Sequence, residues 1–339
     1  MKIRLAFAGF RHAHIFSLYG LAGNTPEIEV VAACEEDDAT RKSLAEAGKV
    51  KITHSDFSTM MSEVQCDAVA IGDYYAKRGA LAIKALELGK HVIADKPICT
   101  NMEELNRIEK LLSEKNLKLG CMLDMRDIPQ IIGVRNLIRK GMIGDIHAIS
   151  FGGQHPLMLG VRPAWYFEPG KHGGTINDIA VHAIDFIPWV TGLSFETVNS
   201  ARCWNAFATD YPHFKDASQM MLTMNNGCGV LGDVSYFVPD SFGYSLPYYW
   251  RTTFFGRKGI IETFATAQRI SIAVNGEKEL KALDINQSNP GGYLKSFLND
   301  LAGTSAEEEL NTASVLKAAK IALTIQEAGD KGLRDLSLK

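Results

Sequence analysis

The sequence predicts two domains of different classes, an α/β domain with a parallel sheet followed by an α+β domain with a mostly antiparallel sheet. The chain has 339 residues, which is more than one average domain requires. Short apolar runs alternate with helix-like segments up to about residue 121, a pattern typical of βαβ units. Beyond about residue 147 the strand-like segments are longer and alternate, and Asn225-Asn226-Gly227 indicates a hairpin.

In the first part, apolar runs predict strands, and the segments between them predict helices. Gly89 gives one helix its stop, and Thr100 or Asn101 starts the next, with Glu103 and Glu104 in its first turn. The predicted strands are 3–8, 27–33, 67–71, 91–94 and 118–122, and the predicted helices are 12–21, 37–47, 76–88 and 101–114.

The second part begins with a predicted helix over 128–140, which Gly141 ends. We expect strands over 217–223, 230–237, 250–255, 259–264 and 270–274, and an amphipathic helix over 311–328. We therefore place the domains at 1–122 and 123–339, and the helix over 311–328 is a candidate to pack back on the first domain.

Composition excludes several classes of function. The 36 basic and 39 acidic residues give a net charge of −3 without long like-charge blocks, so we expect no nucleic-acid or membrane partner. No apolar stretch approaches the roughly 20 residues that span a bilayer. The six cysteines are scattered without a C-x-x-C pair, which favours a reducing cytoplasm and gives no zinc motif.

The turn after the first strand resembles a degenerate phosphate-binding loop. A Rossmann fingerprint, G-x-G-x-x-G, would place glycines at 9, 11 and 14, but the chain has Gly9, Arg11 and His14. An ordinary strand-to-helix turn remains the alternative. Arg11 could replace the missing glycines by offering a cation to the pyrophosphate.

Glu35 ends the second predicted strand, 21 residues after His14. An acid at this place accepts hydrogen bonds from the adenosine ribose, and its charge favours NAD over NADP. The alternative is that Glu35 only caps the helix that follows.

Two local motifs carry the candidate chemistry. Asp95-Lys96-Pro97 follows the strand 91–94, so Lys96 lies where open α/β sheets bind ligands, although an idle surface lysine is the alternative. Further along, Asp178, His182 and Asp185 share one helical stripe at i, i+4 and i+7. A carboxylate one turn from an imidazole holds it and tunes its basicity.

The same helix has two other interpretations. Its apolar stripe, Ile176, Ile179, Ala183, Phe186 and Val190, would leave Asp178 and His182 on an exposed polar face. Asp178 and His182 also have the spacing of metal ligands, with His155 and His172 nearby in sequence. Because no clear third ligand is present, we expect no metal here. The glycines Gly173-Gly174 would let a substrate or the nicotinamide approach the backbone.

These motifs resemble those of the Gfo/Idh/MocA family of oxidoreductases. Asp95-Lys96-Pro97 after Gly89-Lys90-His91-Val92 resembles the family's E-K-P motif, and Gly173-Gly174 with Asp178, His182 and Asp185 resembles G-G-x-x-x-D-x-x-x-H-x-x-D. Residues 85–92, Arg126 and 141–145 are also similar. The loop glycines, the family's T-P-N-x-x-H segment (73–78 here) and the E-K-P glutamate are replaced, which indicates a divergent subfamily.

The resemblance implies an NAD-binding Rossmann domain and a second domain with a large open sheet that forms a homodimer or homotetramer. It implies reversible hydride transfer between NAD(H) and a secondary hydroxyl of a sugar or cyclitol. In that role Lys96 orients the hydroxyl and His182 is the general acid and base, while Asp178 positions both substrate and His182. The cofactor-binding candidates are Gly9, Phe10, Arg11, His12, Glu35, Asp73 and Lys96.

Candidates for the substrate site are polar and aromatic residues of the second part. With Asp178 and His182 they are Arg126, His155, Trp165, Tyr166 and Lys171, and also Arg162 and His172. Tyr244, Tyr248, Tyr249 and Trp250 could form a loop over the site or a subunit contact. Core packing is the alternative for each aromatic residue.

Two rival functions remain open at this point. One is a redox-neutral glycosidase or lyase that uses bound NAD transiently. The other is a sugar or NAD sensor without catalysis, against which the combination of Lys96, Asp178 and His182 argues.

Overall fold

The computed structural model describes residues 2–338, and the chain divides into two compact units. The first comprises the chain up to Met122 together with Pro163–Gly173 and Tyr293–Ala319. The second comprises Leu123–Arg162, Gly174–Gly292 and the chain from Lys320 onward. Two later segments are therefore part of the first unit, although they follow it at a distance in sequence.

The first unit contains a five-stranded parallel sheet whose strands are buried apolar runs, as in sheets covered on both faces. The strands are β1 (Ile3–Ala8), β2 (Ile28–Cys34), β3 (Ala68–Ile71), β4 (His91–Ala94) and β5 (Leu119–Cys121), in the order β2-β1-β3-β4-β5. A parallel bridge joins Cys34 to His54 beyond β2. Counting this bridge as a strand gives the 3-2-1-4-5-6 order of a Rossmann sheet, with β1 and β3 at the switch point.

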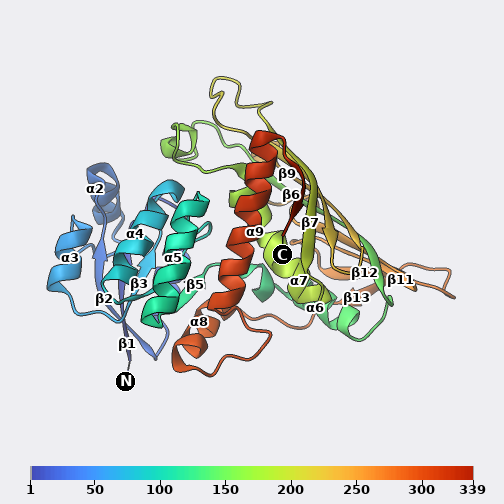
Figure 1. The fold of residues 1–339 in the computed structure, drawn as a ribbon, viewed down its shortest axis with the longest axis horizontal. Coiled ribbons are helices and arrows are strands. Elements are labelled where there is room, and N and C mark those ends of the chain that lie inside the picture. Colours follow the sequence, from blue (N-terminus) through green and yellow to red (C-terminus); the bar gives the residue numbers. More distant parts are fainter. Residues whose placement is uncertain (1, 339) are drawn as a thin grey trace. The chain divides into compact units, whose positions relative to one another are not determined.

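Helices connect these strands (Figure 1), and they are α1 (His14–Gly23), α2 (Asp38–Ala47), α3 (Phe57–Glu63), α4 (Tyr75–Glu87) and α5 (Met102–Lys115). Asp37, Asp56 and Asn101 cap α2, α3 and α5 by accepting a hydrogen bond from a backbone N–H three residues on. Among residues 2–338, no side chain caps α1, the helix that follows the Gly9 turn. The backbone N–H groups at the start of α1 are therefore suited to an acceptor other than a capping side chain.

The second unit contains a nine-stranded sheet, drawn as long adjacent arrows in Figure 1. Its order is β13-β12-β11-β10-β6-β9-β8-β7-β14, and β6 with β9 is the one parallel pair among the described strands of this sheet. The strands are β6 (Ile146–Pro156), β7 (Phe195–Trp204), β8 (Ala217–Met224), β9 (Gly229–Val238), β10 (Arg251–Gly256), β11 (Gly259–Thr263), β12 (Arg269–Val274), β13 (Lys281–Asp284) and β14 (Arg334–Ser337). The predicted class, a Rossmann domain plus a mostly antiparallel sheet, is confirmed.

Helices α6 (Pro129–Arg139) and α7 (Val181–Thr191) contact each other in the second unit, and α6 also contacts β11 and β12. Buried and exposed residues alternate along β8 and β9, so one face of the sheet forms a core. Two helices, α8 (Gly292–Ala302) and α9 (Thr312–Lys331), precede β14, and the boundary between the two units falls within α9.

Two further properties hold for residues 2–338. None of their helices is both long and apolar enough to cross a bilayer. None of their six cysteines forms a disulfide, and five of them are buried.

Candidate functional site

The Gly9 turn has no room for a side chain. Gly9 has φ +81°, and a Cβ there would lie 2.5 Å from Cβ of Asp73, which follows β3. The carboxyl ends of β1 and β3 therefore meet at this glycine, and the next residue, Phe10, donates its backbone N–H to Glu35 Oε2 at 2.6 Å. The one glycine that the fingerprint retains is the one that this close approach requires.

Glu35 is completely buried at the end of β2. Its carboxylate also accepts the backbone N–H of Asp37 at 2.9 Å, while Asp37, not Glu35, caps α2. Burial raises the pKa of Glu35, although the two backbone hydrogen bonds act in the opposite direction. Helix capping therefore does not explain Glu35, and its carboxylate belongs to the Gly9 turn.

Arg11 reaches across the carboxylates at this edge of the sheet. Its Nε lies 3.6 Å from Glu35 Oε1 and 3.3 Å from Asp73 Oδ1, and its guanidinium lies over the Tyr74 ring. Asp73 is itself buried and pairs with Lys77 at 3.0 Å. The cation predicted for the pyrophosphate is thus held next to the predicted ribose-binding acid.

Lys96 lies in the loop that follows β4 and is only 4% exposed, which argues against an idle surface lysine. Arg78 of α4 fastens this loop. Its guanidinium donates to the Lys96 carbonyl at 2.5 Å, to the Asp73 carbonyl at 2.7 Å and to the Asp95 carboxylate at 2.8 Å. Sequence reasoning missed Arg78, and the signal that could have found it is its place in the replaced segment 73–78.

His12 is buried in the same turn and donates its backbone N–H to the Gly72 carbonyl at 3.3 Å. Its Nδ1 contacts Asp95 Oδ2, and its Nε2 lies 3.2 Å from the Tyr75 hydroxyl. Burial lowers the pKa of His12 to about 4 against the opposing effect of Asp95. The imidazole is therefore neutral near pH 7.

Three of the predicted substrate residues pack within the first unit. Trp165 and Tyr166 are buried and stacked, with ring centroids 4.1 Å apart. Trp165 Nε1 donates to the Arg11 carbonyl at 3.1 Å, and the Tyr166 hydroxyl lies 2.8 Å from that of Tyr75. The Lys171 ammonium lies over the Tyr74 ring. These side chains brace the Gly9 turn, so part of their role is packing.

In the second unit, the predicted regular helix begins with a π-helical turn. Ile176–Ala180 is π-helical and leads directly into α7. Asp178, His182 and Asp185 are all at most 5% exposed. The exposed-face interpretation is therefore wrong, because the polar stripe is buried together with the apolar one. Single π-turns in helices occur frequently at functional sites.

Asp178 and His182 have polar partners from distant segments. The Tyr236 hydroxyl of β9 donates to Asp178 Oδ2, and the backbone N–H of Asp178 donates to the Gly174 carbonyl at 3.0 Å. His182 Nδ1 lies 3.7 Å from Asp124 Oδ1, and its ring packs against Trp250. Sequence reasoning missed Tyr236 and Asp124, because no local pattern relates them to this helix.

Arg126 forms a two-bond ion pair with Asp185, with distances of 2.7 and 2.5 Å. Burial raises the pKa of Asp185, and the Arg126 guanidinium opposes this effect. Asp185, the third member of the polar stripe, is thus paired with Arg126, which the sequence predicts to bind substrate. Whether Arg126 also contacts substrate stays a prediction.

His155 is the centre of an aromatic cluster in the second unit. Its ring centroid lies 5.2 Å from the ring centroid of Tyr249, 5.4 Å from that of Tyr244 and 6.1 Å from that of Tyr236. Trp250 is buried, which matches the packing alternative, whereas Tyr248 is 52% exposed. Tyr236 links this cluster to Asp178.

The glycines before the π-turn are explained by packing. Gly173 and Gly174 have φ +79° and +98°. A Cβ on Gly173 would collide with the Thr100 side chain, and one on Gly174 with Gln326. Gln326 Oε1 also accepts the Ile176 N–H at 2.9 Å, which anchors the start of the helix. Neighbouring side chains fill the space next to these glycines.

The candidate residues are divided between the units. The first unit holds Gly9, Phe10, Arg11, His12, Glu35, Asp73 and Lys96, with Trp165, Tyr166 and Lys171. The second unit holds Asp178, His182, Arg126 and His155. Within each unit the structure brings most of its members into one connected group.

Two family models match the chain. Residues 3–122 match the oxidoreductase family with an NAD-binding Rossmann fold, and residues 131–262 match the GFO/IDH/MocA C-terminal domain. Together they cover well over half of the sequence, in the order that the fold shows.

Curated relatives and solved structures are similar over different lengths. Inositol 2-dehydrogenase 1 of Saccharopolyspora erythraea is 26% identical over 73% of this chain and 70% of that protein. Levoglucosan dehydrogenase of Pseudarthrobacter phenanthrenivorans is 26% identical over 53% of this chain and 46% of that protein, so the match covers under half of its length. A structure of levoglucosan dehydrogenase with NADH has a TM-score of 0.80 at 17% identity, with all of both chains covered.

Proposed function

Because the chain belongs to the Gfo/Idh/MocA family of NAD-binding oxidoreductases, we propose that it transfers a hydride between NAD and a secondary hydroxyl of a sugar, cyclitol or similar polyol. The observation that carries this proposal is the buried imidazole of His182 beside a π-turn that also holds Asp178. Buried titratable groups at such turns are candidates for acid–base chemistry. The names of two relatives, inositol and levoglucosan dehydrogenase, support a polyol substrate.

The residues of the first unit fit the dinucleotide. Gly9 and Phe10 form the turn, and the start of α1, which lacks a side-chain cap, can receive the pyrophosphate on its N–H groups. Arg11 and His12 border the same turn, and Glu35 and Asp73 supply carboxylates for ribose hydroxyls. When bound, the nicotinamide supplies the acceptor or donor of the hydride.

Preference for NAD over NADP follows from the charge at the end of β2. Glu35, Glu36, Asp37 and Asp38 are consecutive acids, which would repel a 2′-phosphate. Arg11 lies within 4 Å of Glu35 and reduces this repulsion in part. A ribose diol can share the Glu35 carboxylate with Arg11, whereas a phosphate would compete with it.

Three side chains carry the proposed chemistry. His182 takes the proton of the substrate hydroxyl during oxidation and returns it during reduction. Lys96 donates a hydrogen bond to the oxygen as it gains negative charge. Asp178, held by Tyr236, orients the substrate and the imidazole. General acid–base assistance of this kind contributes about 10²- to 10⁴-fold in rate.

The first test is absorbance at 340 nm with NAD⁺ and a panel of sugars, cyclitols and glycosides. We expect a rise with one class of compound and a turnover about 10²- to 10⁴-fold lower in His182→Ala, with NAD binding unchanged. The exposed His147 on β6 provides the matched control, and His147→Ala should keep the wild-type rate. Wild-type turnover in His182→Ala would refute the role of His182. Product formation from a glycoside without any change at 340 nm would instead support redox-neutral cleavage.

We also propose that two or four copies assemble through the open face of the nine-stranded sheet. Met221 of β8 is paired with Leu231 of β9, and Phe255 of β10 with Ile260 of β11, and all four side chains are at least 40% exposed. Paired apolar side chains on one open face favour burial by a partner. The scattered thiols support a reducing, cytoplasmic location.

A further inference from the structure

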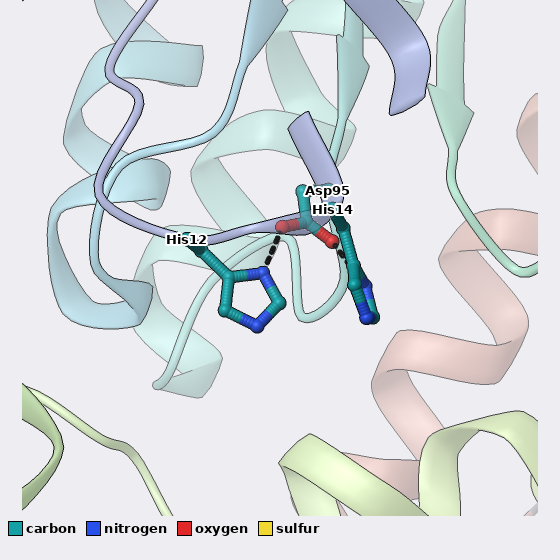
Figure 2. A group of neighbouring side chains, drawn as sticks. All are labelled: His12, His14 and Asp95. Carbon is teal, nitrogen blue, oxygen red and sulfur yellow. Dashed lines mark hydrogen bonds and ion pairs between the residues drawn. The ribbon is translucent and has the colours of Figure 1, made fainter. Parts of the chain in front are cut away.

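Two histidines and one aspartate converge at the Gly9 turn (Figure 2). His12 Nδ1 contacts Asp95 Oδ2, and His14 Nδ1 lies 3.3 Å from Asp95 Oδ1. One ligand atom from each of the three residues lies within 4.8 Å of the others. His12 lies in the turn before α1, His14 is the first residue of α1, and Asp95 directly follows β4.

The two oxygens of Asp95 have different surroundings. Oδ2 accepts from Arg78 and contacts His12 Nδ1. Oδ1 is buried and has no hydrogen-bond donor with acceptable geometry among residues 2–338, although His14 lies within ion-pair distance. A buried carboxylate oxygen without a donor destabilises the folded state. This oxygen points to the side of the cluster where His14 lies, so the two groups can share one cation.

The residues around the cluster resemble the outer shell of a metal site. The Tyr75 hydroxyl lies 3.2 Å from His12 Nε2, so it can accept the ring N–H when Nδ1 binds a metal. Arg78, with no exposed surface, holds the other oxygen of Asp95. Ligating histidines and carboxylates in proteins are oriented by such second hydrogen bonds.

We propose that His12 Nδ1, His14 Nδ1 and Asp95 Oδ1 bind one divalent transition metal of the Zn²⁺ or Fe²⁺ class. Two imidazoles and one carboxylate suit these ions, whereas Mg²⁺ and Ca²⁺ prefer oxygen ligands throughout. Three protein ligands leave at least one position open to an exchangeable ligand. This proposal departs from the expectation of no metal, which rests on Asp178 and His182 and does not consider His12, His14 and Asp95 as ligands.

The site also accounts for a departure in the phosphate loop. His14 occupies the third glycine position of the fingerprint, where a side chain would ordinarily obstruct the close packing of helix and strand. Here its ring turns back toward Asp95 and is 42% exposed, so it reaches the cluster from the solvent side. The proposal does not depend on the proposed dehydrogenase activity, because it concerns binding alone.

Titration of the chelator-treated, full-length protein with Zn²⁺ against a chromogenic chelator tests the site. We expect one Zn²⁺ per chain and a loss of affinity of at least about 10- to 100-fold in His14→Ala. His14 is partly exposed and caps no core element, so this variant should fold, which circular dichroism checks. His147→Ala, which removes an exposed histidine elsewhere, should bind as the wild type does.

A second measurement identifies the ligands. Co²⁺ in place of Zn²⁺ should give visible absorption bands of a nitrogen- and oxygen-bound site, and these bands should be lost in His14→Ala. The proposal is overturned if the wild type binds no Zn²⁺, or if His14→Ala binds it with unchanged affinity and spectrum.

Discussion

Arg78 is the side chain on which the Lys96 loop depends. It has no exposed surface, and it ion-pairs with Asp95, which has none either. Removing one partner of a buried ion pair leaves an uncompensated charge, at a typical cost of 3–5 kcal/mol. At the scale of single residues, Arg78 therefore has a larger effect than any surface ion pair of the chain.

We expect Arg78→Ala to lower the free energy of unfolding by about 3–5 kcal/mol in urea titrations. Arg107 offers a matched control, because its pair with Glu87 is 2.7 Å long but about half exposed. Arg107→Ala should change the stability by no more than about 1 kcal/mol. A loss of under about 1 kcal/mol in Arg78→Ala would show that the buried pair does not hold the loop.

Helix α9 is fastened at its start by a carboxylate of α8. Asp300 accepts the Thr312 N–H at 2.8 Å and the Thr312 hydroxyl at 2.6 Å, and Lys118 lies 3.2 Å from its other oxygen. Burial by itself would raise the pKa of Asp300, but the hydrogen bonds from Thr312 and the Lys118 ammonium lower it. The charged form is therefore favoured in the folded state.

The sign of the pH dependence follows from this lowered pKa. Stability from Asp300 is present above its unfolded pKa of about 3.9 and is lost as the pH falls through its folded pKa. Asp300→Asn should be about 1–3 kcal/mol less stable than wild type at pH 7. This difference in the free energy of unfolding should become smaller below about pH 4. Urea titrations of both proteins at pH 7 and pH 3.5 measure the difference. Asp210→Asn, an exposed control, should show no gap, and a gap for Asp300→Asn that is independent of pH would contradict the assignment.

Elements with strong local signals could be predicted from the sequence. The Asn225-Asn226-Gly227 turn indicated the β8–β9 hairpin, and Asn101 was one of two predicted caps of α5. The short helix α3 and the edge strands β13 and β14 were missed, because a few residues carry little periodicity and pairing decides their structure. The π-turn at Ile176–Ala180 was also missed, since the same residues satisfy a regular helical pattern.

The residues of the candidate site also divide into those that local sequence motifs predict and those that only the fold brings to the site. Gly9, Glu35, Lys96, Asp178 and His182 follow from motifs with fixed spacing along the chain. Tyr236 and Asp124 do not, because they reach Asp178 and His182 from β9 and from the segment before α6. Tertiary structure alone places them, and a single sequence holds no signal for it.

At the scale of the whole molecule, the nine-stranded sheet has an open, partly apolar face. A groove of about 620 Å³ on this sheet is lined by residues of β6 to β9 and β14, including Met221 and Leu231. Leu231, near the start of β9, is 59% exposed. In an assembly with twofold symmetry the same patch meets itself, so one substitution acts twice at the interface.

We expect Leu231→Arg to convert the proposed dimer or tetramer into a smaller species, because it places two desolvated charges at the interface. Light scattering coupled to size-exclusion chromatography measures the mass of each species. Leu280, which is 69% exposed outside the strands, is the control, and Leu280→Arg should leave the mass unchanged. A wild-type monomer, or an unchanged oligomer in Leu231→Arg, would exclude this face as the contact.

The cysteine thiols allow local opening of the two units to be followed separately. Cys99 belongs to the first unit and Cys228 to the second, and burial raises the pKa of their thiols to about 12 and about 11. Alkylating reagents attack the thiolate, so neither sulfur reacts until its surroundings open. The alkylation rates of the two peptides, read by mass spectrometry, would therefore report local opening of each half separately in the unmodified protein.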